Sequence, residues 1–198
     1  MAIVVVGGHS RSVGKTSVVA GLIAALPELH WTAMKITQYG HGICSTKGRL
    51  CHCACDGDSW AITEELDRAG NTDSSRFLVA GAERSLWVRT RQGMLGDAMP
   101  SVRKELEEAP NTIFESNSIL HFLQPDLYLT VLDRATADFK ASAQQFLKRA
   151  DAVILHDGSA EAAWNNISLN SVGDVPMFHI TPPEYVTPDL VDFVRGRI

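Results

Sequence analysis

The chain has 198 residues, of which 45% are hydrophobic and 21% are charged, and its formal net charge is -5 at pH 7. These values are typical of a globular domain with a substantial core, and the negative charge excludes a strongly basic nucleic-acid-binding surface. No apolar run approaches the roughly 18 residues that span a bilayer, and the N-terminus lacks the pattern of a signal peptide. We therefore expect one domain over residues 1–198, in the cytoplasm, with no nucleic-acid or membrane partner.

Segments with strand character alternate with segments with helical character along the chain. The expected strands are short apolar runs: Ala2–Val6, His30–Ile36, Glu83–Thr90, Asn111–Glu115, Pro125–Leu132, Asp151–His156 and Pro176–Ile180. The expected helices are Lys15–Leu26, Ser59–Ala69, Thr72–Ala82, Met99–Ala109, Ala135–Ala150 and Pro188–Arg197. A helical turn is expected at Ser118–Leu123. The alternation predicts right-handed βαβ units, and hence an α/β fold with a mostly parallel central sheet and helices on both faces.

The first expected strand leads into a loop bounded by glycines, and the first expected helix begins at Lys-Thr. This order is typical of a P-loop, in which backbone N–H groups cradle phosphates. Lys15 would place its charge at the β- and γ-phosphates, and Thr16 would offer its hydroxyl to Mg²⁺. Five residues separate Gly8 from Gly14, one more than in the usual P-loop. The expected nucleotide-binding residues of this loop are consecutive: Gly8, His9, Ser10, Arg11, Ser12, Val13, Gly14, Lys15, Thr16 and Ser17.

The longer loop, Gly8-His-Ser-Arg-Ser-Val-Gly14-Lys15-Thr16, resembles the Gly-Thr-Asp-Thr-x-Val-Gly-Lys-Thr loop of dethiobiotin synthetases. Those enzymes belong to the SIMIBI class of P-loop NTPases, so the resemblance implies a three-layer P-loop NTPase fold. Lys35 ends the second expected strand, where that family has a lysine near phosphates and substrate. Asn71-Thr72-Asp73 resembles the family's Asn-Ser-Asp, whose Asp helps to hold Mg²⁺. Glu115 lies where the family has its metal-linked glutamate.

The residues themselves leave alternatives open at these three positions. Asp73 either helps to hold Mg²⁺ or caps the following helix. Glu115 ends a buried strand, at the sheet edge where ligands bind in open α/β sheets, and its carboxylate suits Mg²⁺ or an attacking water. Lys35 either contacts phosphate or is a solvated strand end. We expect Thr16, Asp73 and Glu115 to serve the metal, Lys35 to join the nucleotide site, and Lys15, Asp73 and Glu115 to serve catalysis.

A second resemblance and two departures bear on the role of the protein. Asp73-Ser74-Ser75-Arg76, followed by Ala80-Gly81-Ala82, is similar to a stretch of the molybdopterin-guanine dinucleotide biosynthesis protein B family, a GTP-binding SIMIBI group. Glu115 is followed by Ser116-Asn117-Ser118, whereas dethiobiotin synthetases have Gly-Ala-Gly-Gly there and protein B relatives have a Gly. His9 stands where ParA and MinD ATPases carry an extra lysine, which disfavours their filament and membrane roles. The choice between ATP and GTP stays open, because the Asn-Lys-x-Asp motif that reads guanine is absent.

All four cysteines lie within twelve residues, in a segment at about 38–58 without helical or strand periodicity. We expect a long loop there. Thiolates so close together favour a Zn²⁺ ion or an iron–sulfur cluster, although the spacing C-x6-C-x-C-x-C is not a common finger or ferredoxin pattern. The alternatives are a redox pair and plain loop thiols, since structural disulfides are unexpected in a cytoplasmic protein. The candidate metal ligands are Cys44, Cys51, Cys53 and Cys55.

Together these patterns predict a protein that binds ATP or GTP with Mg²⁺ and hydrolyses or transfers the γ-phosphate. The resemblances imply an accessory NTPase of cofactor biosynthesis, acting with a partner enzyme and forming a homodimer. One alternative is an ATP-dependent ligase or kinase that acts on a small acid, as dethiobiotin synthetase does. Another is a nucleotide- or metal-binding regulator without useful turnover.

Overall fold

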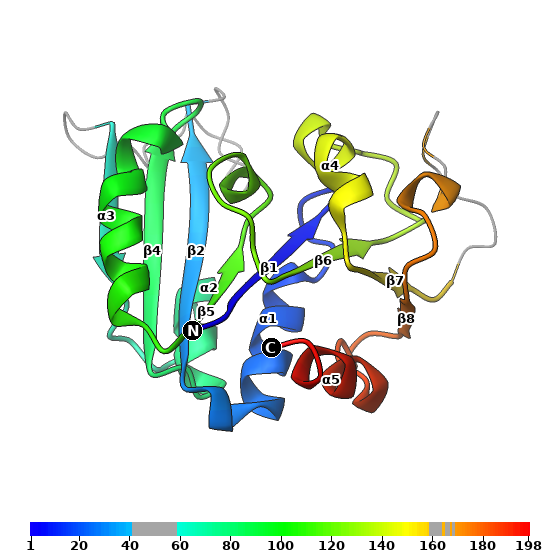
Figure 1. The fold of residues 1–198 in the computed structure, drawn as a ribbon, viewed down its shortest axis with the longest axis horizontal. Coiled ribbons are helices and arrows are strands. Elements are labelled where there is room, and N and C mark those ends of the chain that lie inside the picture. The colour runs from blue at the N-terminus through cyan, green and yellow to red at the C-terminus, as the bar shows by residue number, and fades with distance from the viewer. Residues whose placement is uncertain (41–58, 159–163, 165–166, 168) are drawn as a thin grey trace.

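The computed structural model describes residues 1–40, 59–158, 164, 167 and 169–198, and its centre is one eight-stranded sheet (Figure 1). The strand order is β3-β4-β2-β5-β1-β6-β7-β8. All neighbouring strands are parallel except β3 and β4, which are antiparallel. The strands are β1 (Ile3–Gly8), β2 (Trp31–Tyr39), β3 (Trp60–Glu64), β4 (Arg84–Arg91), β5 (Asn111–Glu115), β6 (Leu127–Leu132), β7 (Ala152–His156) and β8 (Met177–Ile180).

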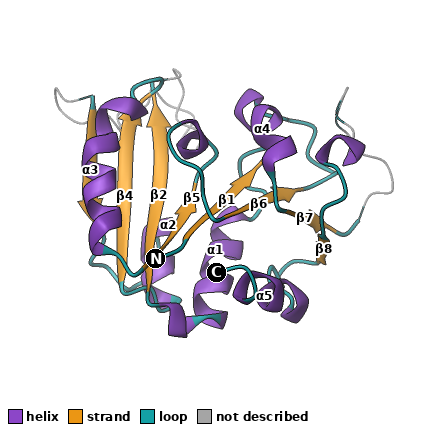
Figure 2. Ribbon diagram, viewed as in Figure 1, coloured by secondary structure: helices purple, strands orange, loops and turns teal. Residues whose placement is uncertain are grey.

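Helices cover both faces of this sheet (Figure 2). One core lies between the sheet and α1 (Lys15–Ala25), α2 (Asp73–Val79) and α5 (Pro188–Arg195). The other core lies between the sheet and α3 (Leu95–Glu108), α4 (Ala141–Phe146) and three 3-10 helices, which are η2 (Ser118–His121), η3 (Leu147–Arg149) and η4 (Leu169–Val172). A further 3-10 helix, η1 (Pro27–Leu29), joins α1 to β2.

The alternation of side chains along the strands explains why both cores form. In β1, Val4 and Val6 belong to the first core and Val5 to the second, and all three are fully buried. A strand that is apolar on both sides needs cover on both faces, which is the condition met in a parallel sheet. The predicted three-layer α/β architecture is therefore confirmed.

The helix predicted over Ser59–Ala69 is wrong. Residues Trp60–Glu64 form β3, which pairs antiparallel with β4 at the edge of the sheet. Trp60 and Ile62 pack into the second core, because alternate residues of an edge strand face the same helix layer. Tertiary pairing thus overrides the local helical pattern of this segment.

The other helices also differ in their bounds from the predicted ones: α1, α2 and α5 are shorter by one to four residues, and the starts of two more helices shift. α3 begins at Leu95, four residues before the predicted start, and Leu95 is buried. The helix predicted over Ala135–Ala150 is shorter, because α4 begins only at Ala141. Residues 135–140 are drawn instead to the loop after β1, as described below.

The predicted cysteine-rich loop at 38–58 lies almost entirely outside the described residues, because the structure describes the chain only to Gly40 before it resumes at Ser59. The metal prediction for Cys44, Cys51, Cys53 and Cys55 therefore concerns residues outside the description. In the described part of the chain, no group of three or more metal-ligating side chains comes together. None of the helices described is long and apolar enough to cross a bilayer.

Candidate functional site

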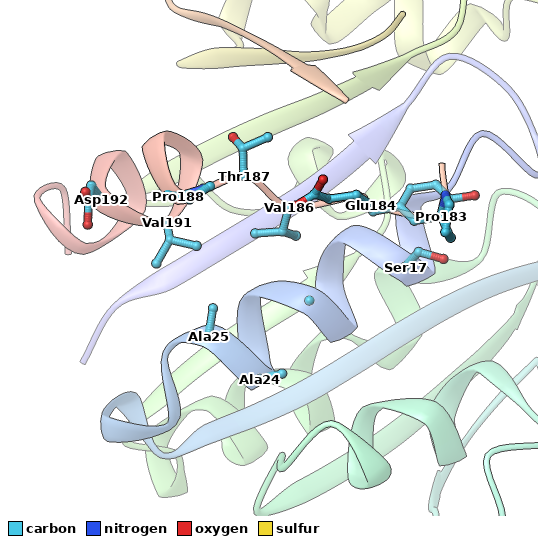
Figure 3. A pocket seen from close by; sticks show the side chains of 12 residues that line it. Ser17, Ala24, Ala25, Pro183, Glu184, Val186, Thr187, Pro188, Val191 and Asp192 are labelled. Atoms are coloured by element: carbon cyan, nitrogen blue, oxygen red, sulfur yellow. The ribbon is translucent and has the colours of Figure 1, made fainter. Parts of the chain in front are cut away.

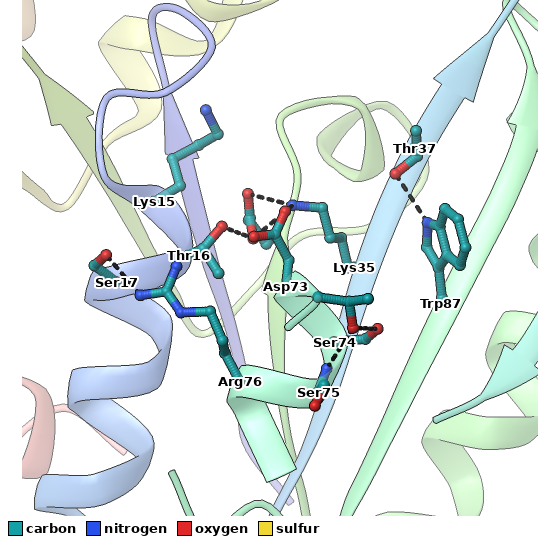
Figure 4. Close-up of polar contacts among 12 residues, drawn as sticks. Lys15, Thr16, Ser17, Lys35, Thr37, Asp73, Ser74, Ser75, Arg76 and Trp87 are labelled. Carbon is teal, nitrogen blue, oxygen red and sulfur yellow. Dashed lines mark hydrogen bonds and ion pairs between the residues drawn. The ribbon is translucent and has the colours of Figure 1, made fainter. Parts of the chain in front are cut away.

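One polar cluster lies at the C-terminal end of β5, between β1 and the middle of β2, because β2 runs on to Tyr39 rather than ending at Ile36 as predicted. The register pairs Val6 of β1 with Glu115 of β5, and Glu115 with Lys35 of β2. α1 begins directly after the loop that follows β1, and Thr16 in its first turn donates to Glu115 Oε2 at 2.8 Å. Figure 4 shows Thr16, Lys35 and Asp73 turned toward one another from α1, β2 and α2. Residues far apart in the sequence thus meet at one edge of the sheet.

Lys35 is the centre of this cluster. Its ammonium group donates to both carboxylate oxygens of Glu115, at 3.1 Å each, and to Oδ2 of Asp73. Burial by itself would lower the pKa of Lys35, but the carboxylates of Glu115 and Asp73 outweigh burial and raise the pKa. Glu115 is only 6% exposed, and burying its carboxylate without a cation would be strongly destabilising. The ion pair with Lys35 compensates that cost.

Asp73 stands at the open side of the cluster, where its side chain is 45% exposed. The cap of α2 is Thr72, whose side chain accepts a hydrogen bond from the Ser75 backbone N–H. The carboxylate of Asp73 is therefore engaged with Lys35 rather than with the helix end.

Lys15 lies at the start of α1, folded back over the preceding loop. Its ammonium group donates to the carbonyl oxygen of Ser10 at 2.6 Å. Burial lowers the pKa of Lys15 to about 8; Glu115 counteracts the shift, and Lys140 and Lys35 add to it. A partly buried ammonium group that contacts only a neutral carbonyl among the described residues is well placed to exchange that contact for an anion.

The loop is held from one side by β5 and the residues after it. The Gly8 backbone N–H donates to Asn117 Oδ1 at 3.0 Å, and Asn117 Nδ2 donates to the Gly8 carbonyl at 2.8 Å. At Gly7 a Cβ atom would lie 2.1 Å from Asn117 Oδ1, so only glycine admits this side chain. The amide of Asn117 thereby fixes the start of the loop.

Residues 136–140 hold the same loop from the other side. His9 Nε2 donates to the Thr136 carbonyl at 3.1 Å, and Ser10 Oγ donates to Asp138 Oδ2 at 2.6 Å. The Lys140 backbone N–H donates to the His9 carbonyl at 2.8 Å. These contacts explain why α4 starts later than predicted, since the preceding residues serve the loop instead of a helix.

The side chains of His9 and Ser10 therefore face protein. His9 is fully buried, and its ring lies 5.1 Å from that of Phe139 and 5.3 Å from that of Trp164, measured between centroids. Burial lowers the pKa of His9, which favours the neutral ring. The backbone N–H of His9 is engaged as well, since it donates to the Val131 carbonyl at 3.3 Å.

Lys140 adds a further cation at the loop. Its ammonium group makes no hydrogen bond or ion pair with any residue that the structure describes, yet Arg11, Glu115 and Lys35 are within electrostatic reach. Burial lowers the pKa of Lys140, and the nearby charge of Arg11 lowers it further. Lys15 and Lys140 are both partly buried beside the loop, which suits an anionic ligand.

The last turn of the loop is closed by the segment between β8 and α5. Gly14 has a φ of 88°, and a Cβ atom there would lie 2.4 Å from the ring of Tyr185. His156, at the end of β7, donates through Nε2 to the Val13 carbonyl at 2.9 Å. Only glycine satisfies both the left-handed backbone and the contact with the ring.

We expect Gly14→Ala to lower the free energy of unfolding by about 2–3 kcal/mol, because backbone strain and overlap with Tyr185 act together. Urea denaturation measures the change. Gly93→Ala is the matched control, since Gly93 has a similar φ of 82° with open space around it, and should lose only about 1 kcal/mol. Equal losses in the two variants would show that the contact with Tyr185 has no effect.

A groove of about 710 Å³ runs along α1 beneath the same segment (Figure 3). It is lined by small residues of α1 and by Pro183, Tyr185 and Val186. Ser17 is the lining residue nearest in sequence to Lys15, and neither Lys15, Lys35 nor Glu115 lines the groove. The groove is therefore separate from the polar cluster.

Comparisons with known proteins identify the fold. No protein family description and no curated protein sequence matches the chain. A solved structure of similar fold is LpxK from Aquifex aeolicus in complex with ATP, with a TM-score of 0.52 and 17% identity over 90% of this chain and 53% of LpxK. HypB from Helicobacter pylori in complex with nickel gives a TM-score of 0.47 and 15% identity, over 98% of this chain and 83% of HypB. Bacillus subtilis MobB gives 0.44 and 16%, over 100% and 98%.

LpxK is a P-loop NTPase, and the match to it extends over most of this chain. This chain has the P-loop NTPase fold. The segment Gly8–Ser17 joins β1 to α1 where we expect the P-loop, and Lys15 and Thr16 occupy the first turn of α1. LpxK is about twice the length of the region matched, so the similarity concerns the fold alone.

Of the residues predicted for the site, Thr16, Lys35, Asp73 and Glu115 lie in one cluster, and Lys15 lies beside it. Their roles in nucleotide binding, metal binding and catalysis stay predictions. Several residues that shape the site were missed. They are Asn117, His156 and Tyr185, which fix the P-loop, Lys140, which adds charge, and Arg76, which donates to Ser17 Oγ at 3.0 Å. A signal existed for Asn117, which stands in the segment where the resembling families have glycines.

Proposed function

We propose that this protein binds a nucleoside triphosphate at the P-loop and hydrolyses or transfers its terminal phosphate. The observation that carries the proposal is that Thr16 and Lys35 meet Glu115 at the end of β5, with Lys15 beside them at the start of α1. The loop that precedes Lys15 is fixed at its start by Asn117. The N-terminus of α1 adds its dipole to the same point. Catalysis at such a site consists mainly of positioning and charge neutralisation.

The oxygen atoms at the cluster fit Mg²⁺. The Thr16 hydroxyl and the Glu115 carboxylate already meet, and Asp73 stands beside them with an exposed carboxylate. Mg²⁺ bound with phosphates needs only one or two protein carboxylates and keeps several waters. These residues would hold the ion, which would neutralise charge on the phosphates.

Nucleotide titration followed by thermal unfolding tests the proposal. ATP or GTP with Mg²⁺ should raise the midpoint of unfolding in a concentration-dependent way, because a ligand that binds only the native state stabilises it. The same titration without Mg²⁺ measures the contribution of the metal. Absence of any shift with either triphosphate would contradict the proposal.

We expect triphosphate affinity to fall by about tenfold at pH 9 relative to pH 7, because Lys15, with a pKa of about 8, is mostly neutral at pH 9 in the free protein. Lys140, whose pKa is also lowered, acts in the same direction. Isothermal titration at several pH values measures the effect. Lys15→Arg should show a flatter profile, since arginine keeps its charge; an equally steep profile would assign the dependence to another group.

Lys15 has the opposite effect on the stability of the free protein. Its folded-state pKa lies below its unfolded-state value, so between the two values the unfolded chain binds more protons than the native state. The contribution of Lys15 to the free energy of unfolding therefore rises with pH across that window.

The finer role we propose is that of an accessory NTPase of cofactor biosynthesis that acts with a partner enzyme. Its support is the resemblance of Asp73-Ser74-Ser75-Arg76 to the protein B family, together with the contact of Arg76 with Ser17, which links α2 to the helix after the P-loop. Slow hydrolysis that a partner stimulates would favour this role.

A ligase or kinase acting on a small acid is the second candidate. It is favoured by a partly exposed row of side chains that leads away from Lys35 across the sheet. Turnover that depends on a small carboxylate or phosphate compound would favour this candidate over the first.

A further inference from the structure

The polar cluster continues from Lys35 toward the β3 edge of the sheet. The register pairs Lys35 with Trp87 of β4, and Trp87 with Thr63 of β3. Neighbouring strands lie about 4.8 Å apart, so Trp87 stands next to Lys35 on the same face. One pleat further along the strands, Thr37 of β2 is paired with Arg89 of β4.

Four of these side chains, Thr37, Thr63, Trp87 and Arg89, form a contact network that we call the β4 platform. Trp87 Nε1 donates to Thr37 Oγ1 at 3.0 Å, and Arg89 donates to Thr63 Oγ1 at 2.8 Å. The guanidinium carbon of Arg89 lies 4.7 Å from the centre of the Trp87 ring. Figure 4 shows Trp87 turned toward Thr37. Stacking leaves the N–H groups at the edge of the guanidinium directed away from the ring, as arginine uses them to bind oxyanions.

The β4 platform lies beyond the start of α2. That helix begins at Asp73, and Ser85 Oγ donates to the Ser74 carbonyl at 2.9 Å, which fixes the first turn over Ser85, one pleat before Trp87. The four side chains of the platform are all partly or fully exposed. A ligand can therefore approach them on the face that carries Lys35.

Arg89 has binding capacity that the described residues do not use. Its guanidinium has no carboxylate partner among them, and its buried Nε donates no hydrogen bond to any of them. Arg84, at the other end of the same strand, is by contrast paired with both Glu64 and Glu105. An oxyanion would bind the terminal nitrogens of Arg89, one of which also donates to Thr63 Oγ1. Thr37 accepts from Trp87, so its hydroxyl proton is left to donate.

We propose that the β4 platform is a second ligand site, where Arg89 and Thr37 bind the carboxylate or phosphate group of a small molecule beside Trp87. A molecule bound at the β4 platform would lie next to Lys35. In the proposed function, the terminal phosphate of the nucleotide also binds near Lys35. Only the closeness of this molecule to the terminal phosphate rests on the proposed function, since anion binding at Arg89 needs no nucleotide.

The test uses Lys15→Ala protein, in which the P-loop has lost its lysine and competes less for anions. Succinate and, separately, inorganic phosphate are titrated while thermal unfolding and tryptophan fluorescence are followed. We expect at least one of the two anions to raise the unfolding midpoint and to change the fluorescence. The anion with the larger effect shows whether the site prefers a carboxylate or a phosphate group. In Arg89→Gln protein the apparent Kd should rise at least about tenfold, the loss expected for one charged hydrogen bond.

Arg103→Gln is the matched control, because Arg103 is exposed on α3, on the opposite face of the sheet, and should leave the titration unchanged. Thr37→Val supplies a second test if Arg89→Gln fails to fold. No anion effect in Lys15→Ala protein, or an equal effect with and without Arg89, would overturn the proposal. Either result leaves triphosphate binding by the unmodified chain to be judged separately, so the two proposals can fail independently.

Discussion

Lys15→Ala should weaken the binding of ATP or GTP at least about 100-fold, which corresponds to about 2.8 kcal/mol. The substitution removes a partly buried cation that lies at the start of α1 and contacts only the Ser10 carbonyl among the described residues. Charged hydrogen bonds to phosphate are among the strongest that a side chain makes in a buried site. Isothermal titration with Mg²⁺ present measures the loss.

Lys148→Ala is the control for this experiment, because it removes the same charge from an exposed position on η3. Its affinity should stay within about twofold of the unmodified protein. An affinity of the Lys15→Ala protein equal to that of the control would contradict the proposed nucleotide site. A circular dichroism spectrum of each variant excludes loss of the fold as the cause.

Lys35→Met should lower the free energy of unfolding by about 3 kcal/mol at neutral pH, because it leaves Glu115 buried without its cation. Methionine keeps most of the length of the side chain, so lost packing contributes little. Chemical denaturation measures the change. Lys104→Met, at an exposed position of α3, serves as the control and should alter stability by less than about 0.5 kcal/mol.

A double variant separates the ion pair from other causes. In Lys35→Met/Glu115→Gln the uncompensated charge is gone, so most of the stability lost in the single variant should return. A double variant as unstable as the single one would mean that Lys35 stabilises the fold in another way. Triphosphate binding should remain weak in the double variant, because the site has lost both groups.

Most of the strands could be predicted because each is a buried apolar run with a polar boundary. Val4, Val5 and Val6 must be covered on both faces, and a parallel sheet between helices provides that cover. The P-loop could be predicted for a similar reason, since its pattern consists of consecutive residues: Gly14 for the turn, and Lys15 and Thr16 at the start of the helix. At Gly14 the requirement is visible in a φ of 88°.

The β3 strand and the late start of α4 could not be predicted from local patterns. Ile62 faces the second core only because β3 pairs with β4, a partner more than 20 residues away in the sequence. Residues 136–140 carry helical character, yet Thr136 and Asp138 bind the P-loop, which lies at the other end of the chain. Long-range hydrogen bonds decided both cases over local propensity.

The sequence by itself determined the features that are set by residues close together in the chain. These are the buried strands, the P-loop pattern, and the positions of Lys35, Asp73 and Glu115 relative to the strands and helices. Only the tertiary structure decided which side chains meet. Lys35 joins Asp73 to Glu115, Asn117 and Lys140 secure the two sides of the loop, and Trp87 with Arg89 extends the row across the sheet. The physical reason is that the register between strands, rather than distance along the chain, sets which side chains share a face.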